Sequence, residues 1–247
     1  MTYIILVAGQ GKNLQPLTLN HPKTLYKLDG NTTVLQRLVR SIRKYDKEAE
    51  IVVVVGFMYR HIQQELEYEN VKFVHNPFYA VTSSMGSLWF AKDYLQRENV
   101  TIVNGDIVLS DDLINDVICT YTDVPYVLLD STQTKGNKYN VQVQDDRVCV
   151  MSKNLTDFLG NYASVAKLDA VSSRFVLDQL NLMVNEGMYN LFFEDALVQM
   201  IFDNNFELYY KDIKGYKWTE VDSVDDLLKA KKIHSEKNIY SYERNNI

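Results

Sequence analysis

Apolar runs of strand length alternate with amphipathic segments along the first half of the chain, and this alternation limits the possible folds more than any other feature. The apolar runs are Tyr3–Ala8, Ile51–Val55, Val71–His75 and Val100–Asn104. The amphipathic segments between them cover residues 33–45, 58–67 and 87–97. Units of this βαβ type need right-handed crossovers and bring their strands into one sheet. The sequence therefore predicts an α/β fold with a Rossmann-like, mostly parallel sheet flanked by helices.

The pattern changes after the apolar run Val124–Asp130. The later elements are predicted to be a β-hairpin over 139–144 and 147–152, helices over 171–185 and 190–203, and a strand over 206–212. The capping box Ser223-Val224-Asp225-Asp226 predicts the start of a last helix, which runs to about residue 236. The polar tail over 237–247 is expected to be frayed.

A glycine loop follows the first apolar run, in Leu6-Val7-Ala8-Gly9-Gln10-Gly11-Lys12. Two glycines spaced by one residue free backbone N–H groups to point at an anion, and a triphosphate would suit such a loop. Taken alone, the segment also fits an ordinary tight turn.

A lysine follows this loop at a fixed distance, behind the φ-restricted proline of Pro22-Lys23. By itself, Lys23 would be a solvated surface lysine. Together with the intervening Asn13-Leu14-Gln15-Pro16-Leu17-Thr18, however, the loop and the Pro-Lys pair resemble the N-terminal signature of the sugar-phosphate nucleotidyltransferase family. The resemblance implies that the loop wraps the nucleotide phosphates and that Lys23 contacts the phosphates near the reacting bond.

The resemblance implies a nucleotide-binding set that begins with Leu6, Ala8, Gly9, Gln10, Gly11, Lys12, Asn13 and Lys23. An arginine of the family falls on Asn13, which cannot make a bidentate phosphate contact. Lys12 is the nearest candidate to replace it. This departure leaves open a non-catalytic, regulatory nucleotide-binding protein of the same fold.

Two acidic positions fall where strands are expected to end. Asp106 follows Asn104-Gly105 at the end of an apolar run, and Asp222 closes the alternating Trp218-Thr219-Glu220-Val221-Asp222. A turn-forming Asp and a solvated surface strand are the alternatives. Both positions match those at which the family holds Mg²⁺, so the resemblance implies that Asp106 and Asp222 are metal ligands. It also implies that they are catalytic together with Lys23. Two carboxylates are enough to hold Mg²⁺, because substrate phosphate oxygens fill most of its other positions.

The segment from Asn76 to Leu88 is predicted to be a loop that leads into a helix near Ser87. In the family this region closes on the base, which implies nucleotide contacts for Ser84, Gly86 and Ser87. Its form resembles the short phosphocholine cytidylyltransferase-like members, although those commonly have Asn-Asn where this chain has Ser83-Ser84. CTP is therefore the expected nucleotide.

The resemblance to that branch continues through Met151-Ser152-Lys153 and Phe193-Glu194-Asp195-Ala196-Leu197. It implies an acceptor-binding set of Lys153, Tyr189, Glu194, Trp218 and Glu220, although aromatic residues of this kind also pack ordinary cores. The implied architecture is a nucleotidyltransferase, GT-A-like fold in one domain over 1–247. Residues 1–130 would bind the nucleotide, and the hairpin and helices of 131–236 would bind the acceptor.

Composition restricts the partners. With 26 Lys plus Arg against 32 Asp plus Glu, the net charge of −6 disfavours nucleic acid as a ligand. The two cysteines, Cys119 and Cys149, lack metal-ligand spacing and suit a reducing cytoplasm. No apolar run approaches the roughly 20 residues that span a bilayer, so no membrane insertion is expected. A homodimer is expected by analogy with small family members.

The favoured hypothesis is a Mg²⁺-dependent cytidylyltransferase that transfers CMP from CTP to phosphocholine, 2-aminoethylphosphonate or a similar small phosphorylated acceptor, with release of pyrophosphate. A phosphate monoester is its own nucleophile near pH 7, so no Ser-His-Asp or Cys-His arrangement is required. Such an enzyme would supply a precursor for cell-surface polysaccharide or phospholipid. The alternatives are a hexose-1-phosphate nucleotidyltransferase that uses UTP, dTTP or GTP, and the non-catalytic binding protein.

Overall fold

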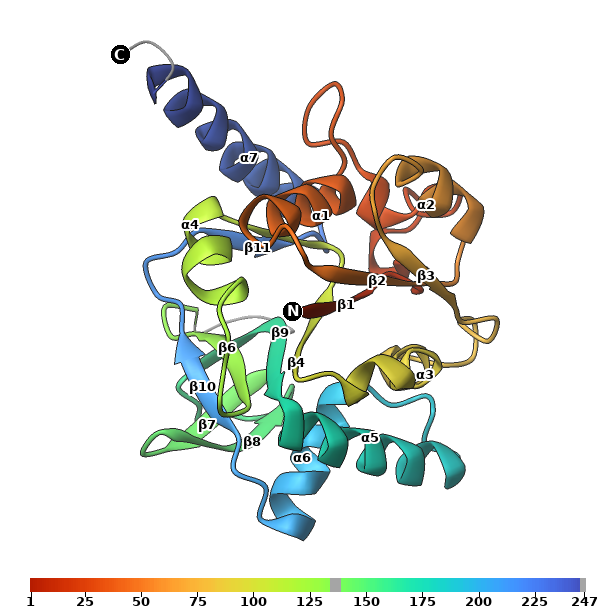
Figure 1. The fold of residues 1–247 in the computed structure, drawn as a ribbon, viewed down its shortest axis with the longest axis vertical. Coiled ribbons are helices and arrows are strands. Elements are labelled where there is room, and N and C mark those ends of the chain that lie inside the picture. The colour runs from red at the N-terminus through yellow and green to blue at the C-terminus, as the bar shows by residue number, and fades with distance from the viewer. Residues whose placement is uncertain (134–138, 245–247) are drawn as a thin grey trace.

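A mixed sheet with helices on both faces forms the centre of the molecule (Figure 1). The computed structural model describes residues 1–133 and 139–244, with the backbone alone at residue 13 and over 237–244. The strand order in the large sheet is β3-β2-β1-β4-β9-β6-β10-β8-β7. Two strands outside it, β5 and β11, pair with each other.

The predicted parallel half of the sheet is confirmed. Its strands are β1 (Thr2–Leu6), β2 (Glu50–Val55), β3 (Lys72–His75) and β4 (Asn99–Asn104), and all four run parallel. The helices between them are α1 (Val34–Tyr45), α2 (Tyr59–Glu65) and α3 (Ser84–Phe90). Helix α1 starts where Thr33 and Gln36 form a capping box, each side chain bonding the other residue's backbone N–H.

The second half contains the predicted hairpin, helices and late strand. These elements are β6 (Tyr126–Asp130), β7 (Asn140–Gln144), β8 (Arg147–Ser152), α5 (Ala170–Asn185), α6 (Phe193–Asn204) and β10 (Tyr209–Asp212). The last helix, α7 (Val224–Arg244), continues past the predicted end near residue 236. Residues 245–247 of the predicted frayed tail lie outside the described residues.

Strand β9 (Gly160–Asp169) was not predicted, although it lies at the centre of the sheet. It pairs antiparallel with β4 on one side and with β6 on the other, and so joins the parallel half to the rest of the sheet. The short strands β5 (Ile107–Leu109) and β11 (Trp218–Glu220) pair antiparallel. Shorter helical turns are η1 (Lys12–Leu14), η2 (Lys23–Leu25), η3 (Lys92–Gln96), α4 (Asp111–Leu113) and η4 (Ile114–Ile118).

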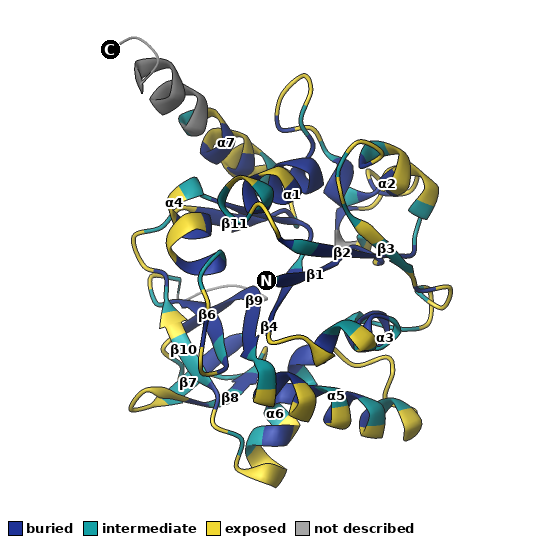
Figure 2. Cartoon of the chain, viewed as in Figure 1, coloured by how far each residue is buried: buried dark blue, intermediate teal, exposed yellow. Residues whose placement is uncertain are grey.

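Two large apolar clusters lie on opposite faces of the sheet. Helices α1 and α2 bury Leu38 and Ile62 in one cluster, whereas α3, α5 and α6 bury residues such as Leu88 and Leu197 in the other. Figure 2 shows the strands buried between these layers, with exposed residues on the outer sides of the helices. Burial of this apolar surface is the main stabilising contribution that such a fold has.

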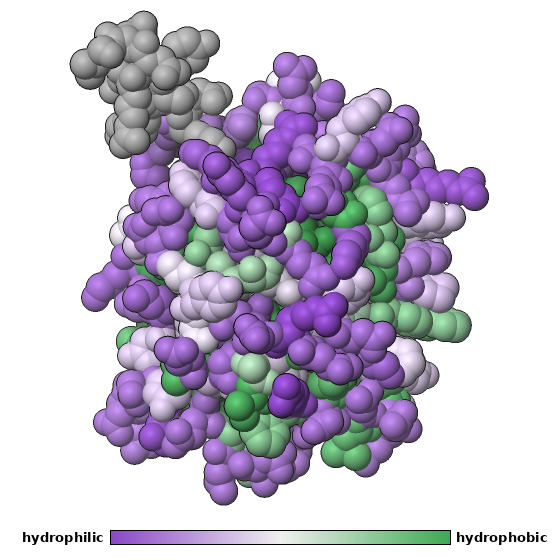
Figure 3. All heavy atoms as spheres, viewed as in Figure 1, coloured by the Kyte–Doolittle hydropathy of each residue, from purple (hydrophilic) through white to green (hydrophobic). Residues whose placement is uncertain are grey.

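The outer surface is largely hydrophilic on the face that Figure 3 shows, with apolar side chains gathered near α5 and α6. Exposed apolar residues of α5 include Val171, Phe175 and Leu182. Among the described residues, no helix has the length and apolar character that a membrane span requires.

Candidate active site

A cavity of about 450 Å³ opens at the carboxyl ends of β1 and β4. This is the edge of a parallel sheet at which α/β folds bind ligands. Its lining comes from both halves of the chain. Fourteen of the predicted site residues line it: Leu6, Ala8, Gly9, Gln10, Gly11, Lys12, Lys23, Ser84, Ser87, Asp106, Lys153, Glu194, Glu220 and Asp222.

The glycine loop forms one wall of this cavity. Gly11 has a φ of 62°, in the left-handed region that favours glycine, and the Thr18 hydroxyl donates a 2.7 Å hydrogen bond to its carbonyl. A Cβ placed on Gly9 would meet no atom within 4 Å. A ligand can therefore approach the backbone of Gly9 closely. The side chain of Asn13 lies outside the described residues.

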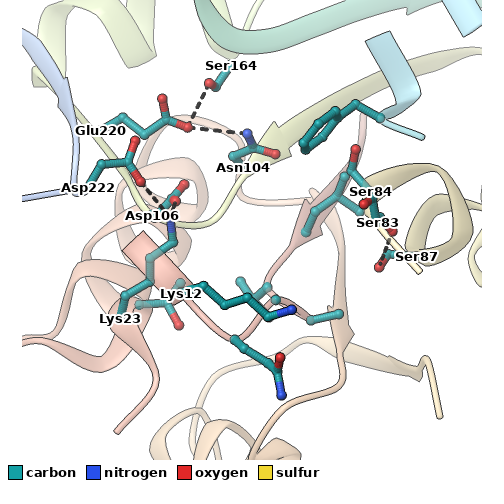
Figure 4. A pocket seen from close by; sticks show the side chains of 18 of the residues that line it. Lys12, Lys23, Ser83, Ser84, Ser87, Asn104, Asp106, Ser164, Glu220 and Asp222 are labelled. Atoms are coloured by element: carbon teal, nitrogen blue, oxygen red, sulfur yellow. Dashed lines mark hydrogen bonds and ion pairs between the residues drawn. The ribbon is translucent and has the colours of Figure 1, made fainter. Parts of the chain in front are cut away.

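Lys23, Asp106 and Asp222 meet on the rim beside this loop (Figure 4). The Lys23 ammonium forms an ion pair with Asp106 and donates a 2.9 Å hydrogen bond to Asp222. Burial alone would lower the pKa of Lys23, but the charges of Asp106 and Asp222 outweigh it and hold that pKa above its ordinary value. The lysine therefore carries its positive charge at this site.

The backbone holds the two acids together across a long stretch of sequence. In the β5–β11 ladder, Ile107 pairs with Glu220, and the Val221 N–H donates a 2.9 Å hydrogen bond to the Asp106 carbonyl. Asp222 lies just beyond this ladder, in a bend before α7. The predicted convergence of Asp106 and Asp222 thus results from pairing of two short strands, of which only β11 was predicted.

The carboxylate of Asp106 is suited to bind a cation. Asp106 is only 5% exposed, and its Oδ1 atom has no hydrogen-bond partner in the described part of the chain. Burial raises the pKa of Asp106 to about 6, with the positive charge of Lys23 opposing the rise. An unpaired buried carboxylate oxygen is costly, so a bound cation would be stabilised there.

Among the side chains that the structure describes, in residues 1–133 and 139–236, no group of three or more His, Cys, Asp or Glu has the arrangement of a metal site. Mg²⁺ often uses one or two carboxylates and fills its other positions with phosphate oxygens and water. Asp106 and Asp222 could therefore hold Mg²⁺ once a nucleotide supplies the remaining oxygens.

Glu220 lines the same wall but is already hydrogen-bonded. Its Oε1 accepts a 2.9 Å hydrogen bond from the Ser164 hydroxyl and a 3.4 Å bond from the Asn104 side-chain amide (Figure 4). Ser164 has a φ of 54°, which is unusual within a strand. Neither Ser164 nor Asn104 was predicted to be a site residue. Strand β9, which carries Ser164, was itself missed.

The predicted base-facing loop forms another part of the lining. The buried Asn76 side chain donates to Thr82 at 2.9 Å and to Ser87 at 3.0 Å, which fixes the loop before α3. The Ser84 hydroxyl accepts a 2.9 Å hydrogen bond from the backbone of Phe193. Gly86 does not line the cavity. A Cβ there would lie 2.7 Å from Thr82, so glycine permits the close packing of α3.

The predicted acceptor-binding residues divide into two groups. Lys153, Glu194 and Glu220 line the cavity, whereas Trp218 and Tyr189 do not. The Trp218 indole is buried and donates a 2.7 Å hydrogen bond to Asp130. Tyr189 contributes its backbone carbonyl, which accepts from the Ser83 N–H at 3.2 Å. Both residues therefore support the fold around the cavity.

Further lining residues were not predicted. They include Tyr162, and also Tyr139 and Phe192, whose rings lie beside the Lys153 ammonium. Their types were visible in the sequence, but aromatic residues are common in any core and carry no spacing signal of their own.

Comparison with known proteins defines the family. Residues 3–165 match the model of the MobA-like NTP transferase domain. The chain belongs to this family. It is therefore a nucleotidyltransferase, as predicted from the glycine loop and the Pro22-Lys23 pair.

The transferase has relatives with full-length similarity. It is 25% identical to the choline-phosphate cytidylyltransferase of Streptococcus pneumoniae over 244 residues, which cover 96% of this chain and 100% of the relative. It is 24% identical to the CTP:phosphoglutamine cytidylyltransferase of Campylobacter jejuni over 257 residues, with 92% and 98% coverage. The predicted resemblance to short cytidylyltransferases is confirmed.

The fold of the transferase also matches solved structures. The structure of the CTP:phosphocholine cytidylyltransferase from Streptococcus pneumoniae superposes with a TM-score of 0.77 at 20% identity, covering 94% of this chain and 98% of that one. The predicted nucleotidyltransferase fold is confirmed.

Proposed function

We propose that this nucleotidyltransferase transfers CMP from CTP to a small phosphorylated acceptor in a Mg²⁺-dependent reaction that releases pyrophosphate. The proposal depends chiefly on one observation. Lys23, Asp106 and Asp222 meet beside the glycine loop, on the rim of a cavity lined by both halves of the chain. The similarity to two cytidylyltransferases over nearly their whole length supports CTP as the nucleotide.

Each group has a distinct task in this proposal. The backbone N–H groups around Gly9 and Gly11 bind the triphosphate, and Lys23 offsets the negative charge that develops at the α-phosphorus. Mg²⁺ bound to Asp106 and Asp222 would neutralise phosphate oxygens and align the reactants. An oxygen of the acceptor phosphate forms the new bond to the α-phosphorus while the bond to the bridging oxygen of pyrophosphate breaks.

We further propose that residues 1–130 hold the nucleotide and residues 131–236 hold the acceptor. The acceptor half contributes Lys153, whose ammonium could pair with the acceptor phosphate. The described free cysteines Cys119 and Cys149 suit the reducing cytoplasm, where CTP is made. The homodimer remains a prediction that light scattering of the purified protein would test.

The decisive experiment crosses CTP, UTP, dTTP and GTP with phosphocholine, 2-aminoethylphosphonate and hexose 1-phosphates, and measures pyrophosphate release. We expect turnover with CTP and the small acceptors, and its loss when EDTA removes the metal. Turnover with hexose 1-phosphates alone would instead support the alternative transferase. Binding of nucleotide without release of pyrophosphate in any combination would contradict the enzymatic proposal.

A further inference from the structure

Two buried side chains in the acceptor part of the cavity each have a polar oxygen without a partner in the described part of the chain. Glu194 is 4% exposed and Tyr162 is 3% exposed, and both line the cavity. Neither Glu194 Oε2 nor the Tyr162 hydroxyl has a hydrogen-bond partner among the described residues. Leaving such groups unpaired destabilises the folded protein, so their retention at a ligand cavity indicates that a ligand pairs them.

The two groups lie near each other. The negative charge of Glu194 contributes to the rise in the pKa of Tyr162, after burial, which is the larger cause. Glu220, on the neighbouring wall, contributes to the same rise. A ligand group in this part of the cavity therefore meets a carboxyl group and a hydroxyl group, each of which has an oxygen that can accept a hydrogen bond.

The aromatic faces nearby already hold a cation. The Lys153 ammonium lies 4.5 Å from the centroid of the Phe192 ring and 5.5 Å from that of Tyr139. The Tyr139 ring is fixed because its hydroxyl donates a 3.1 Å hydrogen bond to Asp195. Rings of this kind could surround a quaternary ammonium ion, but here a positive charge of the chain itself occupies them.

We infer that the acceptor carries N–H or O–H donors at the end remote from its phosphate, and that Glu194 and Tyr162 select it over an acceptor that ends in a quaternary ammonium group. This inference rests on the proposed function, because it concerns the second substrate of that reaction. A quaternary ammonium has no hydrogen to donate, so it would leave both buried oxygens unpaired. Sites built to pair a substrate donor discriminate strongly against analogues that lack it.

A methylation series tests the inference directly. The acceptors are 2-aminoethyl phosphate, its N-methyl and N,N-dimethyl derivatives, and phosphocholine, which offer progressively fewer N–H donors. The compound 2-hydroxyethyl phosphate adds an uncharged O–H donor and so distinguishes ammonium from hydroxyl recognition. We expect kcat/KM with CTP to be about 10- to 100-fold higher for the best donor-bearing acceptor than for phosphocholine. An equal or higher value for phosphocholine would overturn the inference.

Variants identify the residues responsible. Glu194→Leu and Tyr162→Phe should each reduce the preference for the donor-bearing acceptor severalfold, mainly through its KM. Both remove an unpaired buried polar atom, so they should fold at least as stably as the wild type. Glu186→Gln, at an exposed position after α5, is the matched control and should leave the preference unchanged. An unaltered preference in both Glu194→Leu and Tyr162→Phe would contradict the assignment.

The same experiment separates this inference from the proposed function. Turnover of any member of the series with CTP upholds the function, and the ratio of kcat/KM values within the series then tests the inference alone. If neither the series nor 2-aminoethylphosphonate were turned over with CTP, the proposed function would fall. Calorimetric binding of the same five compounds would still decide whether a donor is preferred.

Discussion

The Lys23 ammonium lies 2.9 Å from the carboxylate of Asp222, although 199 positions separate the two residues in the chain. Because the same ammonium also pairs with Asp106, one positive charge holds two carboxylates at the rim of the cavity. This cluster gives the first testable prediction.

Replacing Lys23 with methionine should lower kcat by about 100-fold or more, because removing one preorganised charge that stabilises a transition state typically has such an effect. The substitution also leaves Asp106 and Asp222 to repel each other, so the melting temperature of the variant without metal should be lower than that of the wild type. Addition of Mg²⁺ should raise the melting temperature of the variant more than that of the wild type. Differential scanning fluorimetry with and without Mg²⁺ measures the second effect. Lys27→Met, at an exposed lysine, is the control. Wild-type turnover in Lys23→Met would exclude the assigned role.

The two acids should be needed for metal-dependent turnover and dispensable for folding. Asp106→Asn and Asp222→Asn keep the side-chain shape but remove the charge, so we expect each to lower kcat/KM by at least about 100-fold. Asp225→Asn, at an exposed acid in the first turn of α7, should behave as the wild type. Pyrophosphate release at several Mg²⁺ concentrations provides the measurement. Full activity in either site variant at low Mg²⁺ would show that the acid does not hold the metal.

Gly9 in the cavity wall and Gly105, between the lining residues Asn104 and Asp106, should respond differently to substitution by alanine. A Cβ on Gly9 meets no atom within 4 Å, so Gly9→Ala should fold normally but raise the KM for CTP, because the added methyl group faces the ligand. A Cβ on Gly105 would lie 2.2 Å from a Val7 methyl group, and Gly105→Ala should lose about 1–3 kcal/mol of stability. Thermal melts and CTP titrations distinguish the two effects. Gly30→Ala is the control, since a Cβ at that position also meets no atom within 4 Å.

Should Gly9→Ala bind CTP as tightly as the wild type, the glycine loop would not contact the phosphates closely. If Gly105→Ala were as stable as the wild type, the close packing of Gly105 against β1 would contribute little.

The buried Glu194 should make stability depend on pH. Burial raises its pKa from the ordinary value of 4.5 to about 8, with Asp195 and Glu220 adding to the rise and Lys153 opposing it. Between these two values the folded protein keeps the proton and the unfolded chain has lost it. The contribution of Glu194 to the free energy of unfolding therefore decreases as the pH rises from about 4.5 to about 8.

Chemical denaturation at a series of pH values tests this contribution. Glu194→Gln, which does not titrate, should show a smaller loss of stability over the same pH window. Glu186→Gln, which removes an exposed carboxylate, should keep the wild-type slope. Identical slopes in the wild type and Glu194→Gln would mean that Glu194 is ionised in the folded protein.

The parallel half of the fold could be predicted because its strands are continuous apolar runs. Residues such as Ile4, Val53 and Ile102 are buried on both faces of the sheet, and such strands are recognisable from composition. Strand β9 could not be recognised in this way. It carries the buried Lys167, whose ammonium donates to the carbonyls of Val117 and Ile118 at 2.9 and 3.0 Å. Only the tertiary structure supplies those partners.

The site residues also divide into those that the sequence reveals and those that only the structure reveals. The glycine loop, Lys23 and the two acids were found because a motif fixes their spacing or because they end predicted strands. Trp218 was expected in the cavity because the resemblance to the short cytidylyltransferases implies an acceptor-binding role for it. Its indole instead bonds Asp130, since a buried N–H requires a partner. Glu194 was predicted from the resemblance, whereas Tyr162 could be considered as a ligand-binding residue only once its buried hydroxyl was seen to lack a partner among the described residues.

The short β5–β11 ladder has an evolutionary consequence. It fixes the positions of Asp106 and Asp222 through backbone hydrogen bonds, which do not depend on the side chains that the segment between Ser110 and Lys217 presents to the cavity. That segment contributes Lys153, Tyr162 and Glu194 to the cavity. Substitutions of the side chains that face the cavity from this segment leave those backbone hydrogen bonds in place. A lineage can thus change the compound it accepts while the reaction itself is inherited intact.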